Sequence, residues 1–88
     1  MTFRFTGLLL RFVGYQRTTE ITATNLADAL RQLRERFPQL RPVLWDESGS
    51  LIRVHRLLLN GELLSKPDDD VPLRDTDQIE VLTAIAGG

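Results

Sequence analysis

The sequence predicts an α+β domain in which one main helix packs on one face of a mixed sheet. Three observations lead to this prediction. The clearest run of apolar residues at helical spacing lies between Asn25 and Phe37. Short segments with alternating polar and apolar residues precede and follow that run. The length of 88 residues allows a single domain with one hydrophobic core.

The N-terminal region predicts two strands. Residues 2–6 alternate polar and aromatic side chains, which places Phe3 and Phe5 on the core face. Residues 8–14 are too apolar for an ordinary hairpin loop, so they either prolong the strand or fold over it. Residues 16–22 form a weaker, threonine-rich strand, expected antiparallel to the first and at an exposed position in the sheet.

The helix is predicted to begin after Asn25, whose side chain can cap the free amides of the first turn. Asp28 is favourably placed for the helix dipole, and Pro38 ends the helix. Arg31 and Glu35 are spaced for an exposed ion pair. The apolar face contains Leu26, Ala29, Leu30, Leu33 and Phe37.

The C-terminal half predicts a short helical turn and two further strands with a short return. Residues 40–45 form the turn, with Pro42 in its first turn and Trp45 as a satellite core residue. Residues 52–60 form a strand with Leu57 and Leu59 on one face and Val54, Arg56 and Leu58 on the other. The only histidine, His55, is expected on the strand surface. Asn60-Gly61 indicates a tight turn, with residues 62–64 returning.

The last ten residues begin as a strand and end as an unusual tail. Ile79 and Val81 alternate with Glu80, whereas residues 83–88 are small and end in Gly87-Gly88. Glycines let a partner's active site close around the backbone. The ionised terminal carboxylate must be activated before it reacts, most simply as an acyl-adenylate. The tail is therefore interpreted as a substrate for another enzyme, although terminal glycines are also common in disordered ends.

Composition narrows the functional classes. The net charge of −1 implies no general attraction to nucleic acid or to membranes. The absence of cysteine excludes disulfides and a thiol nucleophile. The sequence shows neither a signal peptide nor an apolar run that spans a membrane, so a cytoplasmic location is expected. No catalytic machinery, metal site or bound cofactor is predicted in the chain itself, so it is not expected to be an enzyme.

Several segments in the same order resemble the ubiquitin-like sulfur carriers of the ThiS/MoaD family. They are residues 33–38 at the helix end, 59–62 at the asparagine turn, 72–81 at the last turn and strand, and 84–88 at the tail. The resemblance implies a β-grasp fold, with a domain at 1–82 and a flexible reactive tail at 83–88. Thr76 replaces the family's usual glycine, so this turn must be adjusted or strained. Thr83 stands where proline is common in some branches.

The resemblance also implies a mechanism. An ATP-dependent, ubiquitin-activating-type enzyme adenylates Gly88, and a sulfur source then converts the terminus to a thiocarboxylate. The tail then delivers the sulfur to a biosynthetic synthase. Residues threaded into the partner are Gly87, Ala86, Ile85 and Ala84, with Ile85 as an anchor. A tail-processing metallopeptidase is a further possible partner.

Several alternatives remain open at this stage. The pathway served is cysteine-type, molybdopterin or thiamine synthesis, or another thiolation, with a slight preference for the cysteine type from residues 44–62. One alternative joins the tail to a lysine amine, which makes the chain a covalent modifier. Another is that the chain is a plain interaction domain. Leu58 and Leu82 are out of phase with the core positions, so they are candidates for docking the activating enzyme.

Overall fold

The computed structural model describes residues 1–52, 55–64 and 70–83. These residues contain a five-stranded sheet with the order β2-β1-β5-β3-β4. Strands β1 and β5 run parallel at its centre, and the other neighbours are antiparallel. The prediction that the first and last strands lie side by side is confirmed. The strands are β1 (Thr2–Phe5), β2 (Thr18–Glu20), β3 (His55–Leu59), β4 (Glu62–Leu63) and β5 (Gln78–Thr83).

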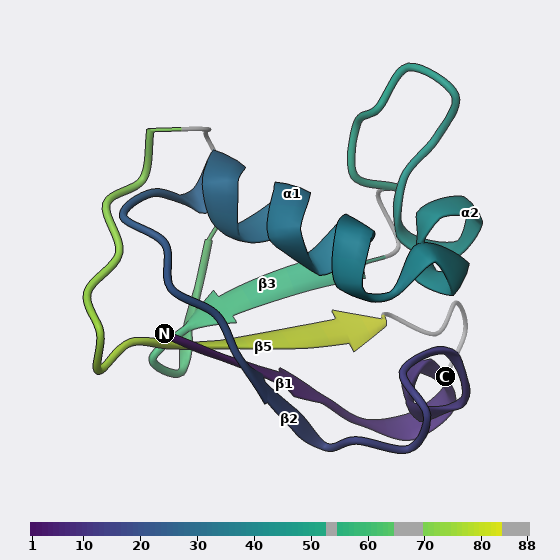
Figure 1. Ribbon diagram of the computed structural model, residues 1–88, viewed down its shortest axis with the longest axis horizontal. Coiled ribbons are helices and arrows are strands. Elements are labelled where there is room, and N and C mark those ends of the chain that lie inside the picture. The colour runs from purple at the N-terminus through teal and green to yellow at the C-terminus, as the bar shows by residue number, and fades with distance from the viewer. Residues whose placement is uncertain (53–54, 65–69, 84–88) are drawn as a thin grey trace.

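One helix, α1 (Leu26–Arg36), lies across one face of this sheet (Figure 1). Its start is fixed as the sequence predicts, because the amide of Asp28 donates to Asn25 Oδ1 over 2.8 Å. On the exposed side, Arg31 pairs with Asp28 and, over 3.1 Å, with Glu35. These contacts stabilise the helix itself, and burial of its apolar face places it on the sheet, which is the predicted β-grasp arrangement.

The hydrophobic core lies between α1 and the sheet, as predicted. Leu26 and Leu33 of the helix are completely buried. Three of the predicted core residues, Leu30, Phe37 and Leu59, are only half-buried and pack against its edge. The predicted strand residues that are fully enclosed are Phe3, Phe5, Leu57, Ile79 and Val81.

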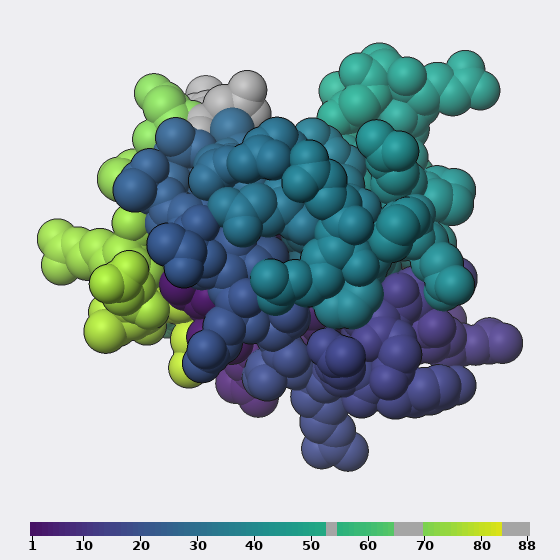
Figure 2. Space-filling model, in the orientation of Figure 1, coloured from purple at the N-terminus to yellow at the C-terminus, as the bar shows by residue number. Residues whose placement is uncertain are grey.

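Two connections complete the core at its ends. A 3-10 helix, Gly7–Phe12, folds back so that Leu9 and Val13 are buried, which settles the two alternatives for this segment in favour of folding over. After α1, a 3-10 turn, Pro38–Leu40, leads into the short helix α2 (Arg41–Leu44). The loop that follows α2 stands away from the rest of the molecule (Figure 2).

Trp45 follows α2 and is 6% exposed, which confirms its predicted role as a satellite core residue. The guanidinium carbon of Arg34 lies 5.1 Å from the centre of its ring, within the range of a cation–π contact. The ring therefore joins the end of α1 to the segment that leads into β3.

Two sequence predictions need correction, and the two alternatives for the turn at Thr76 are decided. β3 begins at His55, so Ile52 precedes the strand, and Val54 lies outside the described residues. His55 is not on the surface: it is 6% exposed, because its ring closes one end of the core and both ring nitrogens have partners there. Thr76 is not among the described non-glycine residues with positive φ, so its turn is adjusted without left-handed strain.

The predicted tight turn between β3 and β4 is present and is tied to β5. Asn60 and Gly61 have φ values of 51° and 85°, as a two-residue hairpin turn requires. The Asn60 side chain donates to Asp77 Oδ1 over 3.0 Å and accepts from the Gln78 amide over 2.9 Å. The turn and the start of the central strand β5 are thus held in one register.

This network gives a pH-dependent contribution to stability. The Asn60 amide, together with the Arg74 amide 2.8 Å from Oδ2, holds the pKa of Asp77 below its ordinary value of 3.8. Because the folded-state pKa is the lower one, the stabilisation is present above the unfolded pKa and is lost as pH falls through the folded pKa. We expect Asp77→Asn to be less stable than the wild type at neutral pH and to lose less stability on acidification.

The measurement is the thermal midpoint followed by circular dichroism from about pH 6 to about pH 2.5, the range in which carboxylates titrate. Asp75→Asn is the matched control, since it removes the same charge from the neighbouring turn. The interpretation is wrong if Asp77→Asn and the wild type lose stability in parallel over this range.

Candidate functional site

The predicted reactive tail leaves the domain from the centre of the sheet. Thr83, the last described residue, belongs to β5, one residue beyond the predicted end of the domain. The predicted tail residues Ala84, Ile85, Ala86, Gly87 and Gly88 lie outside the described residues. Since β5 has β1 on one side and β3 on the other, the chain enters the tail from a strand that is held on both edges.

An apolar surface lies on the sheet face opposite α1, close to the start of the tail. Leu58 is the cross-strand partner of Leu63, and both leucines point away from the helix side. Leu82 of β5 shares this face and is a diagonal neighbour of Leu58, within reach of its side chain. Leu58 and Leu82 are half-buried, and Leu63 is 54% exposed. We call these three residues the leucine patch.

Leu58 and Leu82 were predicted from the sequence as docking residues, whereas Leu63 was not. The signal was available in the Asn60-Gly61 turn, because a two-residue turn fixes which residues face each other across a hairpin. With Leu59 opposite Glu62, Leu63 must face Leu58. The structure thus brings the two predicted docking residues together and adds a third.

Charged side chains border the leucine patch. Glu80 lies between Leu58 on β3 and Arg4 on β1 in one cross-strand row. Arg56 is the cross-strand partner of Leu82, and its guanidinium donates to the backbone oxygen of His55 over 3.2 Å. An apolar centre with a charged rim is the usual arrangement of a protein–protein interface.

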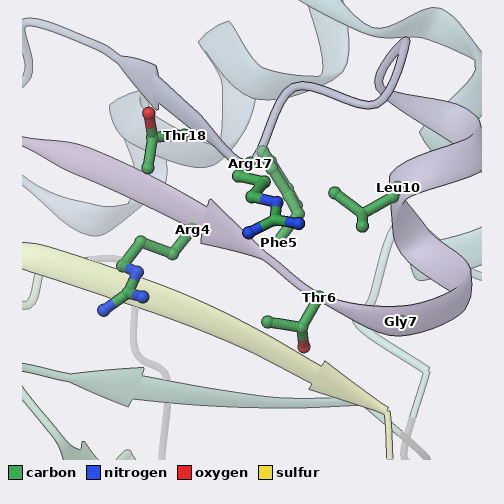
Figure 3. Close-up of a pocket in the computed structure, with 7 residues that line it drawn as sticks. All are labelled: Arg4, Phe5, Thr6, Gly7, Leu10, Arg17 and Thr18. Atoms are coloured by element: carbon green, nitrogen blue, oxygen red, sulfur yellow. The ribbon is translucent and has the colours of Figure 1, made fainter.

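A hollow of about 390 Å³ lies beside Arg4, at the end of β1. Figure 3 shows the Arg4 side chain reaching over β5, with Arg17 beside Phe5 and Thr6 toward the end of the strand. Guanidinium groups form strong, directional hydrogen bonds with carboxylates and phosphates. The hollow is therefore suited to acidic groups on a partner that covers this part of the sheet.

Among residues 1–52, 55–64 and 70–83, His, Asp and Glu side chains form no group of three that could hold a metal ion. The ring nitrogens of His55 are both engaged by neighbouring protein atoms. Within these described ranges, no helix has the length and apolar character needed to cross a membrane. The arrangement is suited to presenting a chain end and a docking face to other proteins.

The fold and this site define the ubiquitin-like class of small β-grasp proteins, which includes sulfur carriers and protein modifiers. The ThiS family model matches residues 4–88, nearly the whole chain and including the terminal Gly-Gly. The chain therefore belongs to the ThiS family. No curated protein matches the chain in sequence.

Solved structures with the same fold are consistent with this assignment. SAMP1 from Haloferax volcanii superposes with a TM-score of 0.86 at 22% identity, covering 100% of this chain and 98% of that one. CysO from Mycobacterium tuberculosis has a TM-score of 0.79 at 22% identity, with coverages of 96% and 98%. A chain of the Amycolatopsis orientalis BexX/CysO complex has a TM-score of 0.83 at 20% identity, with coverages of 99% and 98%. At these identities the similarity concerns the fold.

Proposed function

We propose that this protein is a sulfur carrier whose terminal carboxylate, on Gly88, is adenylated and then converted to a thiocarboxylate. The observation that carries the proposal is the match to the ThiS family through the terminal Gly87-Gly88. It is supported by the way the central strand β5 leads directly into a tail of small residues. The protein acts as a substrate and sulfur donor for partner enzymes and has no catalytic role of its own.

The proposed chemistry has two steps and uses ATP and a sulfur source supplied with the partner enzyme. In the first step, a carboxylate oxygen of Gly88 attacks the α-phosphorus of ATP, and pyrophosphate leaves. In the second step, hydrosulfide attacks the acyl carbon, the carbon–oxygen bond to AMP breaks, and the thiocarboxylate and AMP are formed. A persulfide donor requires a thiol reductant to release the carrier. The carbonyl carbon undergoes substitution without a change of oxidation state.

The tail residues have distinct proposed roles. Gly87 and Gly88 carry no side chains, so the enzyme can enclose the backbone around the reacting carbon. Ala84 and Ala86 keep the preceding segment narrow, and Ile85 supplies an apolar anchor in the partner's channel. A tail of five residues after Thr83 reaches at most about 17 Å, so the domain must dock close to the active site.

The leucine patch is the proposed docking face for the activating enzyme. Its three leucines lie next to the strand that leads into the tail, and a short tail requires docking near that point. We propose an apolar counter-surface opposite the patch, and acidic groups opposite the hollow lined by Arg4 and Arg17. This charge pattern gives the complex a single orientation, in which the tail points into the active site.

Further partners follow from the same cycle. After sulfur transfer to the tail, a sulfur-accepting synthase must bind the thiocarboxylate, and a metallopeptidase is proposed where the product has to be released from the tail. We propose that the cycle operates in the cytoplasm, where ATP is available. We propose a cysteine-type pathway over molybdopterin or thiamine synthesis, on the resemblance of residues 44–62 noted in the sequence.

Covalent modification is the second candidate function. It is favoured by the similarity to the small archaeal modifier protein 1 of Haloferax volcanii, with a TM-score of 0.83 at 20% identity. Both functions begin with the same adenylate. In the modifier, a lysine amine attacks the acyl carbon in place of sulfur, and an amide is formed. The single lysine of this chain, Lys66, offers one internal site for building chains.

Intact mass spectrometry distinguishes the two functions and tests the proposal. The protein is incubated with its activating enzyme, ATP and sulfide, and a variant without Gly88 is the control. We expect one terminal oxygen to be exchanged for sulfur in the wild type and no exchange in the control. If the protein is found joined to target lysines by amide bonds and no thiocarboxylate is detected, the protein is a covalent modifier and the carrier proposal is wrong. If the protein forms no adenylate with its cognate enzyme, both proposals are wrong and a plain interaction domain is the remaining alternative.

A further inference from the structure

A buried histidine connects two segments of the domain at the point where the tail begins. His55 is the first residue of β3, is 6% exposed, and is the cross-strand partner of Thr83. Its Nδ1 lies 3.1 Å from Thr83 Oγ1, and its Nε2 lies 2.7 Å from the backbone oxygen of Val43 in α2. The imidazole ring thus joins α2 to the last described residue of β5.

The partners of the ring determine which tautomer is present. A backbone carbonyl only accepts hydrogen bonds, so Nε2 must carry the proton that is donated to Val43. In the neutral ring, Nδ1 is then an acceptor for the Thr83 hydroxyl. If the ring is protonated, Nδ1 donates to the same hydroxyl oxygen. The Thr83 contact is therefore compatible with both protonation states of His55.

We propose that His55 is a positioning residue for the activation of Gly88, acting through the Thr83 hydroxyl. This inference rests on the proposed function and adds to it the group that fixes where the tail starts. Thr83 is exposed at the end of its strand, a place where chains commonly fray. The hydrogen bond to the buried, doubly held ring ties this last strand residue to the core.

The position of Thr83 matters because the tail is short. If Thr83 separates from β3, the last fixed point of the chain lies one residue further from the terminal carboxylate, so the position of the carboxylate is less closely determined by the domain. Activation requires the carboxylate and the α-phosphorus of ATP to meet in a narrow range of geometry. A fixed starting point raises the fraction of docked complexes that reach this geometry, and it leaves the docking surface itself unchanged.

The matched variants Thr83→Val and Thr83→Ser separate this role from packing. Valine has nearly the shape of threonine and removes only the hydroxyl, whereas serine retains it. Thr83→Val removes the hydroxyl partner of Nδ1 in the buried His55 ring, whereas Thr83→Ser keeps this partner. Thr83 itself is exposed, so the change of side chain at this position creates no cavity. We expect Thr83→Val to lower kcat for adenylation about threefold to tenfold, the range expected for one lost hydrogen bond, and Thr83→Ser to stay close to the wild type.

Two further measurements complete the experiment. Forms of each variant lacking Gly88 serve as inhibitors, and we expect equal inhibition constants, because docking is not affected. In the free proteins, a lower heteronuclear NOE at Thr83 and a shifted Nδ1 resonance of His55 are expected for Thr83→Val alone.

The inference is wrong if Thr83→Val matches the wild type in kcat, or if the NOE and the Nδ1 shift do not change. It is also wrong if Thr83→Ser loses as much activity as Thr83→Val. Since the two NMR measurements need no enzyme, a wild-type protein that is never adenylated would refute the proposed function, while the anchoring of Thr83 would still be decided.

Discussion

Replacement of Leu33 by alanine is expected to lower the free energy of unfolding by about 2–5 kcal/mol. Leu33 is 0% exposed and is one of the three residues of α1 that are completely enclosed, with Leu26 and Ala29. Its removal takes apolar contacts from the core and leaves a cavity that the neighbouring strands fill only in part. Small domains have total stabilities of about 5–15 kcal/mol, so this single change removes a large share.

Urea unfolding followed by circular dichroism measures this loss. Leu30→Ala is the matched control on the same helix, since Leu30 is half-buried at the core edge and should lose less. Leu8→Ala is the exposed control, at 67% exposure, and should be close to neutral. Equal losses at Leu33 and Leu30 would show that the core does not enclose Leu33 more completely than Leu30.

Leu58→Lys is expected to weaken adenylation about 30-fold or more in kcat/KM, the effect of losing a central interface residue. The substitution places a charge in the middle of the leucine patch, against the proposed apolar surface of the activating enzyme. Lysine is preferred to glutamate here because Glu80 lies directly opposite position 58 on β5. A cross-strand pair of opposite charges supports the fold, whereas two carboxylates would weaken it.

The control for this experiment is Leu8→Lys, which adds the same charge at an exposed leucine outside the strands. Thermal unfolding of both variants should stay close to that of the wild type. An unchanged kcat/KM for Leu58→Lys would show that the leucine patch is not the docking face. Equal losses in both variants would indicate a general charge effect on the encounter with the enzyme.

Local patterns predicted most of the elements because each is governed by nearby residues. Asn25 and Pro38 mark the start and the end of α1, and the Asn60-Gly61 pair specifies its turn through backbone conformations that few residues adopt. The conformation of residues 8–14 could not be predicted from local patterns. An apolar run can extend a strand or fold over, and only the space left at the end of the core decides between them.

The burial of His55 is a second feature that local sequence patterns did not predict. By alternation alone, residue 55 belongs to the face of Leu57 and Leu59, but a polar side chain at a strand end favours a surface assignment. The ring is buried because Val43 and Thr83, far apart in the sequence, supply a partner for each nitrogen. Burial of a polar group depends on such partners, and periodicity does not report them.

The sequence by itself determined the β-grasp class, the single capped helix, the family and the tail that ends in Gly87-Gly88. These features depend on short-range spacing and on a terminal motif that is read directly. The tertiary structure alone decided that Leu82 of β5 lies diagonally beside Leu58 of β3, and that the buried ring of His55 contacts the Thr83 hydroxyl. Both are contacts between separate strands, and they exist only after the sheet has fixed which residues face one another.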